Sequence, residues 1–113
     1  MKNDSDVSIA ELKSILMDFS KKRGWDKRQI PQQLAKALVI ESSELLQEFQ
    51  WINDRESCQT KRDSKKRKKI TNELVDILYY LVTIFDYYKL DITSSVHTKL
   101  RLLARRYKVT KTS

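Results

Sequence analysis

Residues 31–52 read PQQLAKALVIESSELLQEFQWI, and this stretch decides the fold. Apolar residues recur in it at steps of three or four, which is the spacing of an amphipathic helix, and Pro31 suits the first turn of such a helix. Two positions of this stripe are carboxylates, and a third acid, Glu44, lies one turn from Glu41, so both side chains can reach the same point. The stripe consists of Leu34, Leu38, Glu41, Leu45, Glu48 and Ile52.

A second helical stretch repeats this arrangement. Its apolar stripe is Ile70, Leu74, Ile77, Leu81 and Ile84. Glu73 and Asp76 lie against the stripe, again three residues apart. Burying an ionised carboxylate alone costs several kcal/mol even after relaxation, and four acids together also repel one another. Either their pKa values rise or cations neutralise them. Because Mg²⁺ prefers oxygen ligands and keeps waters and phosphates, the two pairs predict an open Mg²⁺ site, with Mn²⁺ as the alternative ion.

The acids have two other interpretations. A single Glu-x-x-Glu pair is most simply a surface feature, paired with nearby lysines and arginines. Two pairs on the apolar sides of two helices favour a metal site instead. A di-iron bundle would need Glu-x-x-His on two helices. The positions concerned hold Glu44 and Asp76, and the single histidine, His97, lies far from both in the sequence.

The composition predicts an all-α fold of one domain. The chain has 113 residues with only one glycine and one proline, which favours few, long helices. We expect a helix from the capping box at residues 8–11 to Gly24, then a loop, and the second helix over residues 31–52. A polar linker should cover residues 53–64, and a third helix should start near Ser64 or Lys68 and end near Lys89. A fourth helix, capped by Asp91 or Thr93, should reach about residue 107. Residues 1–7 are expected to be disordered, residues 8–107 to form the domain, and residues 108–113 to form a basic tail.

The net charge of +8 indicates an anionic partner or substrate. Basic residues concentrate at positions 61–69 and again at 101–111; we interpret the first run as a solvated linker. Nucleic acid is the competing ligand, but it leaves the inward acids unexplained and they would repel it, so we do not expect it as a partner. Cys58, the lone cysteine, cannot form an internal disulfide, and no apolar run reaches the roughly 18 residues of a membrane span. We therefore expect a cytoplasmic protein without a membrane partner.

The two acidic pairs also carry a family resemblance. Glu41-Ser-Ser-Glu44 followed by Glu73-Leu-Val-Asp76 resembles the E-x-x-E…E-x-x-D signature of the all-α nucleotide pyrophosphohydrolases of the MazG type. Further segments resemble the small branch that includes the dCTP pyrophosphatases, and together they span about residues 8 to 107. These segments are Arg23-Gly24-Trp25, Pro31, residues 44–51 (ELLQEFQW), residues 73–81 (ELVDILYYL), Lys99 and Arg105-Arg106-Tyr107.

The resemblance implies roles for individual residues. It implies a four-helix MazG-like fold that assembles into an oligomeric helical bundle, as a dimer or a dimer of dimers, with the site near the subunit contacts. It implies that Glu41, Glu44, Glu73 and Asp76 hold Mg²⁺. It further implies that Trp25, Trp51 and Tyr80 surround the base and that Lys99 and Arg106 meet the phosphates. Stacking suits such rings, although plain core packing is the alternative for all three aromatic residues.

The implied activity is Mg²⁺-dependent hydrolysis of a nucleoside triphosphate to a monophosphate and pyrophosphate. Either Glu41 or Glu44 could serve as the general base, and the role would be to clear non-standard or surplus deoxynucleotides. A basic nucleic-acid-binding module and a catalytically silent oligomerisation domain are the competing functions. Three positions depart from the branch, which usually has His, Asn and Asn where this chain has Gln29, Gln33 and Leu103. The metal chemistry is expected to be intact and the base preference to be broader than that of a strict dCTP enzyme.

Overall fold

The computed structural model describes residues 1–110 and is helical throughout. Five α-helices follow one another, with two short 3₁₀ turns, η1 and η2, before α2 and α4. No β-strand occurs within residues 1–110, which confirms the all-α class. The elements are α1 (Ile9–Lys22), η1 (Trp25–Arg28), α2 (Pro31–Gln47), α3 (Asp54–Gln59), η2 (Thr60–Arg62), α4 (Ser64–Tyr87) and α5 (Ile92–Arg106).

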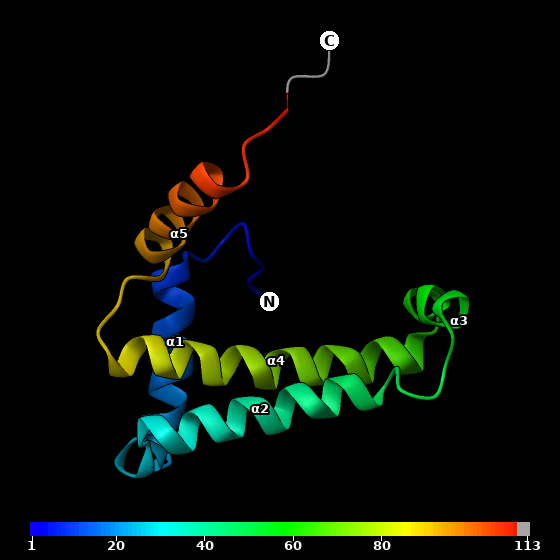
Figure 1. Cartoon of the computed structure of the whole chain (residues 1–113). Coiled ribbons are helices and arrows are strands. Elements are labelled where there is room, and N and C mark those ends of the chain that lie inside the picture. Colours follow the sequence, from blue (N-terminus) through cyan, green and yellow to red (C-terminus); the bar gives the residue numbers. More distant parts are fainter. Residues whose placement is uncertain (111–113) are drawn as a thin grey trace.

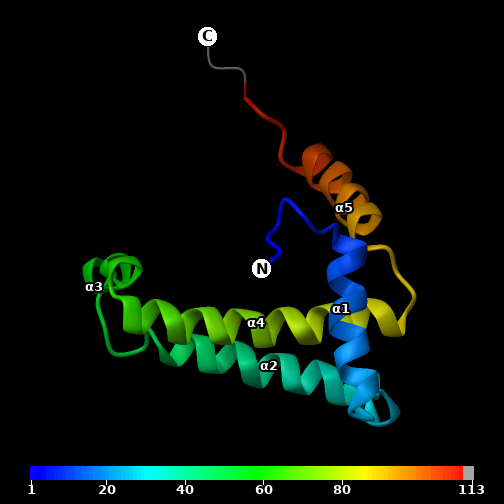
Figure 2. The same cartoon turned by 180° about the vertical axis from the view of Figure 1, so that it is seen from behind.

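The two acid-bearing helices form the centre of the molecule. α2 and α4 lie side by side and run in opposite directions, and their contact is the most extensive between any two elements (Figure 1). α1 crosses α4, as the view from behind also shows (Figure 2). The short α3 projects from one end of the pair, and α5 stands away from it beyond the other end. None of these helices is long and apolar enough to cross a membrane.

The predicted helix starts are confirmed by their caps. The Ser8 hydroxyl accepts a hydrogen bond from the Glu11 backbone N–H at 3.1 Å, and the Glu11 carboxylate accepts from the Ser8 N–H. Asp63 caps α4, so that helix begins at Ser64 and not at Lys68, and Asp91 caps α5. The basic run at 61–69 is therefore partly the first turns of α4 and not only a linker.

Two predictions about the middle of the chain are wrong. The second helix does not reach Ile52, because α2 ends at Gln47 and the following backbone N–H groups turn back in a tighter i to i−3 pattern. The polar linker expected at 53–64 contains α3 and η2 instead, so residues 1–110 form five α-helices and not the expected four. Asn53 and Glu56 form a capping box there, in which the Asn53 side chain accepts from the Glu56 N–H at 2.8 Å. That N-x-x-E pattern was the available signal for α3.

The ends of the chain add little to the fold. Residues 111–113 of the expected basic tail lie outside the described residues, and the expected disorder of residues 1–7 stays a prediction. Gly24, after α1, has a φ of +70°, a left-handed conformation that side chains other than glycine rarely adopt. This residue lets the chain reverse sharply between α1 and η1.

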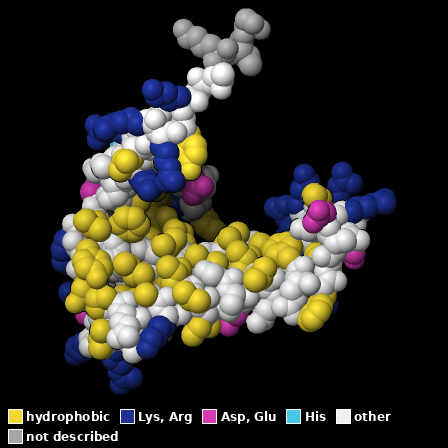
Figure 3. All heavy atoms as spheres, viewed as in Figure 1, with side chains coloured by type: hydrophobic (Ala, Val, Ile, Leu, Met, Phe, Trp, Pro, Cys, Tyr) yellow, Lys and Arg dark blue, Asp and Glu magenta, His cyan; other side chains and the backbone are white. Residues whose placement is uncertain are grey.

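The single chain has a thin core. Among the described residues, Leu34 and Val82 are the fully buried hydrophobic side chains, and Ser20 and Thr83 are the buried polar ones. The radius of gyration is 17.5 Å, against about 13 Å for a compact chain of this length. The accessible surface is 9890 Å², against about 6,500 Å² for a folded monomer of this mass. Apolar side chains accordingly spread over the outer faces of the molecule (Figure 3).

Candidate metal centre

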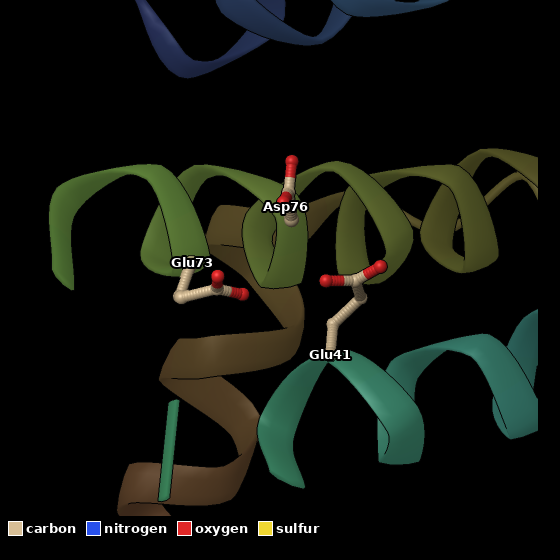
Figure 4. Close-up of side chains that lie close together, drawn as sticks. All are labelled: Glu41, Glu73 and Asp76. Carbon is tan, nitrogen blue, oxygen red and sulfur yellow. The ribbon is translucent and has the colours of Figure 1, made fainter. Parts of the chain in front are cut away.

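The packing of α2 on α4 brings the two acidic pairs together. Glu41, Glu73 and Asp76 each offer a carboxylate oxygen, and these three oxygens all lie within 4.8 Å of one another. Glu41 rises from α2 toward α4, while the Asp76 carboxylate extends on the side of α4 that faces α1 (Figure 4). Glu44 is not one of the acids whose oxygens meet within 4.8 Å, although its charge acts on both Glu41 and Glu73.

Burial leaves two of these oxygens without partners. Glu41 and Glu73 are half-buried, and the Oε2 atom of each is buried with no hydrogen-bond partner among the described residues. An unsatisfied buried polar group costs about 1–3 kcal/mol, and more when it is charged. The donor set consists of carboxylate oxygens alone, which are the ligands that hard divalent cations prefer. These residues therefore fit a divalent cation such as Mg²⁺.

The pKa values of the cluster also indicate a site for a divalent cation. Burial, followed by a hydrogen bond with Glu44 and the negative charges around it, raises the pKa of Glu41 from 4.5 to about 7. Burial and then the charge of Glu44 also raise the pKa of Glu73. Burial raises the pKa of the nearby Tyr80 phenol, and the charge of Glu41 adds to that effect. Without a cation, the cluster therefore reduces its own charge by retaining protons.

The remaining acid of the α2 stripe has a different environment. Glu48 forms a salt bridge with Lys66, whose Nζ lies 3.2 Å from its Oε1. No lysine or arginine within residues 1–110 forms a salt bridge with any of the four acids of the two pairs, Glu41, Glu44, Glu73 and Asp76. Pairing with basic residues therefore accounts for Glu48 but not for the other four acids.

An aromatic cavity of about 440 Å³ opens directly beside the acids. Glu41 and Asp76 form part of its wall, and the residues opposite come from α1, η1 and α4. A second cavity of about 340 Å³ shares three of its aromatic residues, so the two cavities are neighbours on either side of shared rings. The first cavity is lined by Phe19, Trp25, Tyr79 and Tyr80, and the second adds Arg28, Gln29 and Gln33.

The rings in this region meet edge to face. The centroids of Phe19 and Trp25 are 5.8 Å apart, and those of Trp25 and Tyr79 are 6.4 Å apart. Tyr79 and Tyr80 are 5.2 Å apart. Such an arrangement leaves ring faces exposed to the cavity, where a planar base could stack.

The structure brings together only some of the residues that the resemblance assigned to the substrate. Trp25 and Tyr80 lie in the aromatic cavity. Trp51 follows the far end of α2 and is 87% exposed, so the length of that helix, about 25 Å, separates it from Trp25 within one chain. Lys99 and Arg106 lie exposed on α5, which contacts neither α2 nor α4 extensively.

Sequence reasoning missed three residues of these cavities. Phe19 was assigned to the apolar stripe of the first helix, yet it is 47% exposed and lines the cavity. Its ring carries the Arg23 guanidinium 3.4 Å above its centroid. Tyr79 and Arg28 were not among the predicted site residues, although the two adjacent tyrosines at 79 and 80, which line the same cavities, could have indicated an aromatic site.

Comparison with known proteins agrees with this geometry. Residues 36–113 match the MazG-like family, and the chain belongs to that family. It is 31% identical over 105 residues to dCTP pyrophosphatase 1 of Bos taurus, covering 93% of this chain and 62% of the relative. The human protein of the same name is 30% identical over 100 residues, covering 88% and 59%. The chain thus spans about three fifths of the length of these relatives.

A solved structure extends the comparison to the fold. A crystal structure of a pyrophosphatase from Archaeoglobus fulgidus superposes with a TM-score of 0.79 at 32% identity. The match covers 89% of this chain and 93% of the archaeal one. The family resemblance of the acidic signature is therefore confirmed, and the chain is a pyrophosphatase homologue with an all-α MazG-like fold.

The raised pKa of Glu41 predicts how stability depends on pH. Folded protein binds more protons than unfolded protein between pH 4.5 and about 7, so in metal-free buffer its free energy of unfolding should fall as the pH rises through this interval. Adding millimolar Mg²⁺ at pH 8 should restore stability, because the ion binds the folded cluster preferentially. Urea unfolding at pH 5 and pH 8, with EDTA or with Mg²⁺, measures both effects.

A matched pair of variants assigns these effects to the cluster. Glu41→Gln should flatten the pH dependence and remove the Mg²⁺ effect, whereas Glu48→Gln, on the same stripe but paired with Lys66, should retain both. Equal stability at the two pH values in EDTA, together with no response to Mg²⁺, would show that the acids do not form a cation site.

Proposed function

We propose that this protein is a Mg²⁺-dependent nucleoside triphosphate pyrophosphohydrolase that converts a (d)NTP and water to a (d)NMP and pyrophosphate. The observation that carries the proposal is the acidic cluster of α2 and α4 opening into an aromatic cavity. A nucleotide has the matching chemistry, since its phosphates need cations and its base needs a flat apolar surface. The names of the similar proteins support the same reaction class.

Different residues of the chain would bind the metal ion, receive the base and accept the proton. Glu41, Glu44, Glu73 and Asp76 would hold Mg²⁺, while Trp25 and Tyr80 receive the base. A bound Mg²⁺ ion neutralises phosphate oxygens and favours ionisation of a nearby water. Glu41 or Glu44 would accept the proton of the attacking water; both carboxyls are half-buried, and Glu41 lines the cavity. The products would suit an enzyme that clears non-standard or surplus deoxynucleotides.

We further propose that the protein works as a homo-oligomer, a dimer or a dimer of dimers. The outer faces of α2 and α4 are apolar and exposed in one chain, with Val39 67% and Leu46 64% exposed. The single chain also leaves Trp51, Lys99 and Arg106 away from its own cavity. A second copy packed on the α2–α4 faces would cover the apolar surface, and it could supply these three residues to the site.

Substitution of the acids tests the catalytic assignment. Glu44→Gln or Asp76→Asn should lower turnover at least a thousandfold while far-ultraviolet circular dichroism stays helical, since each removes a charged ligand without changing its shape. Pyrophosphate release is measured from a panel of nucleoside triphosphates, with Mg²⁺ and with chelator. Glu48→Gln is the control and should stay within about threefold of wild type. Near-normal turnover of either cluster variant at ordinary Mg²⁺ would contradict the assignment of these acids as metal ligands.

The exposed apolar faces predict self-association. Sedimentation velocity at micromolar concentration should give a species of at least twice the chain mass, because a helix that is apolar on all sides must be covered. Leu46→Glu should shift the distribution toward the monomer. A wild-type monomer throughout the micromolar range would refute the oligomer.

The altered polar positions predict a broad base preference. Where the branch has His, Asn and Asn, this chain has Gln29, Gln33 and Leu103, so fewer buried groups would be left unpaired by a wrong base. Both dCTP and dATP should be substrates when kcat/KM is measured across the deoxynucleoside triphosphates. A single nucleotide favoured more than about a hundredfold would show that other residues read the base.

A further inference from the structure

The basic run at residues 61–69 takes no part in the acidic cluster or in the two aromatic cavities. Seven of its nine residues are lysine or arginine, and all of these except Lys66 are exposed. They lie over η2 and the first turns of α4, at the end of the molecule from which α3 projects, and Lys and Arg side chains gather there (Figure 3). So dense a group of like charges repels itself and favours an anionic partner.

Two residues of the run have structural partners. Lys66 forms the salt bridge with Glu48, and the Arg67 guanidinium donates a hydrogen bond from Nη1 to the Lys61 carbonyl oxygen at 3.0 Å. The Arg67 contact ties η2 to α4. No acid within residues 1–110 forms a salt bridge with another cation of the run. The exposed cations that are left are Lys61, Arg62, Lys65, Lys68 and Lys69.

The acids next to the run are used elsewhere. Asp63 accepts hydrogen bonds from two backbone N–H groups in the first turn of α4, each at 3.1 Å. Glu56 accepts from the backbone N–H of the α3 capping box at 3.3 Å. Asp54, the third acid, is matched in charge by its neighbour Arg55. The carboxylates therefore cap the two helices and do not neutralise the exposed lysines.

The acidic cluster does not oppose an anion at most of these cations. From Lys65 to Glu73, α4 rises by about 12 Å, which exceeds the roughly 8 Å over which exposed charges act in physiological salt. Lys68 is nearer, but five residues turn the helix by about 140°, so it points away from Glu73. Lys69 lies one turn from Glu73 and is therefore set aside. The remaining four cations, which we call the basic corner, are Lys61, Arg62, Lys65 and Lys68.

The composition of this end of the molecule distinguishes between anionic partners. Residues 54–69 include no aliphatic or aromatic residue. A protein partner would need an apolar centre to the interface, and a membrane surface would need an apolar face to receive. Single-stranded nucleic acid would need rings on which its bases stack. A duplex needs only cations against its phosphates, which supply nearly all of non-specific affinity.

The other basic element, α5, has a different surface. Val96 and Leu100 are 48% and 53% exposed beside its cations. Such a mixed apolar and basic face fits coverage by protein, whereas the basic corner has no apolar part. The two basic groups of the chain therefore suit different partners.

We propose that the basic corner binds double-stranded nucleic acid through its phosphates, without reading the sequence. Lys65 and Lys68 lie one turn apart on one face of α4. Lys61 and Arg62 lie on η2, which the Arg67 hydrogen bond holds against that helix. Up to four phosphates can thus be contacted from one rigid end of the molecule. This binding is independent of the proposed function, because it uses none of the residues assigned to the metal ion or the nucleotide.

Fluorescence anisotropy of a labelled DNA duplex measures this binding with the full chain. EDTA is present and nucleotide is absent, so neither a metal ion nor turnover contributes. Wild-type protein should bind with a dissociation constant of about micromolar at about 50 mM salt. The affinity should fall about a hundredfold by about 200 mM salt, the decrease expected of four phosphate contacts. Two duplexes of unrelated sequence should bind alike.

A matched pair of four-site variants assigns the binding to the corner. The corner variant should bind at least tenfold more weakly and lose most of the salt dependence, while pyrophosphate release changes less than about threefold. It combines Lys61→Gln, Arg62→Gln, Lys65→Gln and Lys68→Gln. The control variant loses the same charge from exposed lysines elsewhere and should stay within about threefold of wild-type affinity. It combines Lys2→Gln, Lys21→Gln, Lys22→Gln and Lys27→Gln.

Further measurements keep the proposal falsifiable. If the corner variant loses its helical circular dichroism, Lys65→Gln combined with Lys68→Gln carries the test and should remove about half of the salt dependence. No binding by wild-type protein, or equal losses in the two four-site variants, would overturn the inference. So would tighter binding to a single strand of the same length, or cosedimentation with phosphatidylserine vesicles that the corner variant loses. Duplex binding without pyrophosphate release would reject the proposed function and leave this inference standing.

Discussion

The repulsion among four carboxyls packed between two helices is the constraint on which the rest of this structure depends. The α2–α4 contact is the largest in the chain, and in most helical pairs it would consist of apolar side chains. Here Glu41 and Glu73 occupy part of it, with a buried oxygen on each that has no partner among the described residues. The central contact therefore has less apolar area than its size suggests, and the core of one chain is correspondingly thin.

In the function that we propose, this constraint links the metal ion, the substrate and a second copy of the chain. A cation offsets the repulsion, and burial makes the carboxyls strong ligands once they ionise. The aromatic cavity shares Glu41 and Asp76 with the cluster, so a base bound in it would lie within reach of the same acids. Of the residues that line the two cavities, Arg28 alone is basic. If the substrate is a triphosphate, as we propose, the positive charge that it needs beyond Mg²⁺ would come from residues outside these cavities, such as Lys99 and Arg106 on α5.

Much of this could be predicted from the sequence, because helices obey local rules. The capping box at Ser8 and the periodic stripes predict α1, α4 and α5 with nearly correct ends. The acids within the apolar stripes predict the cluster. The end of α2 was misplaced because Ile52 continues the apolar spacing of the stripe although the backbone there has already turned. The stripe also could not separate Glu48 from Glu41, since only the folded arrangement brings Lys66 to one of them. Tyr79 was missed for the same reason, as its partners Ser20 and Gln29 lie 59 and 50 residues away.

Direct titration with a paramagnetic ion tests the central claim, that these acids form one divalent cation site. Mn²⁺ has an electron paramagnetic resonance spectrum that loses intensity on binding, so free ion can be counted in the absence of any nucleotide. The account predicts that the wild-type chain binds Mn²⁺ at neutral pH, that Mg²⁺ displaces it, and that Glu73→Gln weakens binding at least tenfold. Mn²⁺ that stays free at millimolar protein, or that binds Glu73→Gln as tightly as wild type, would contradict it.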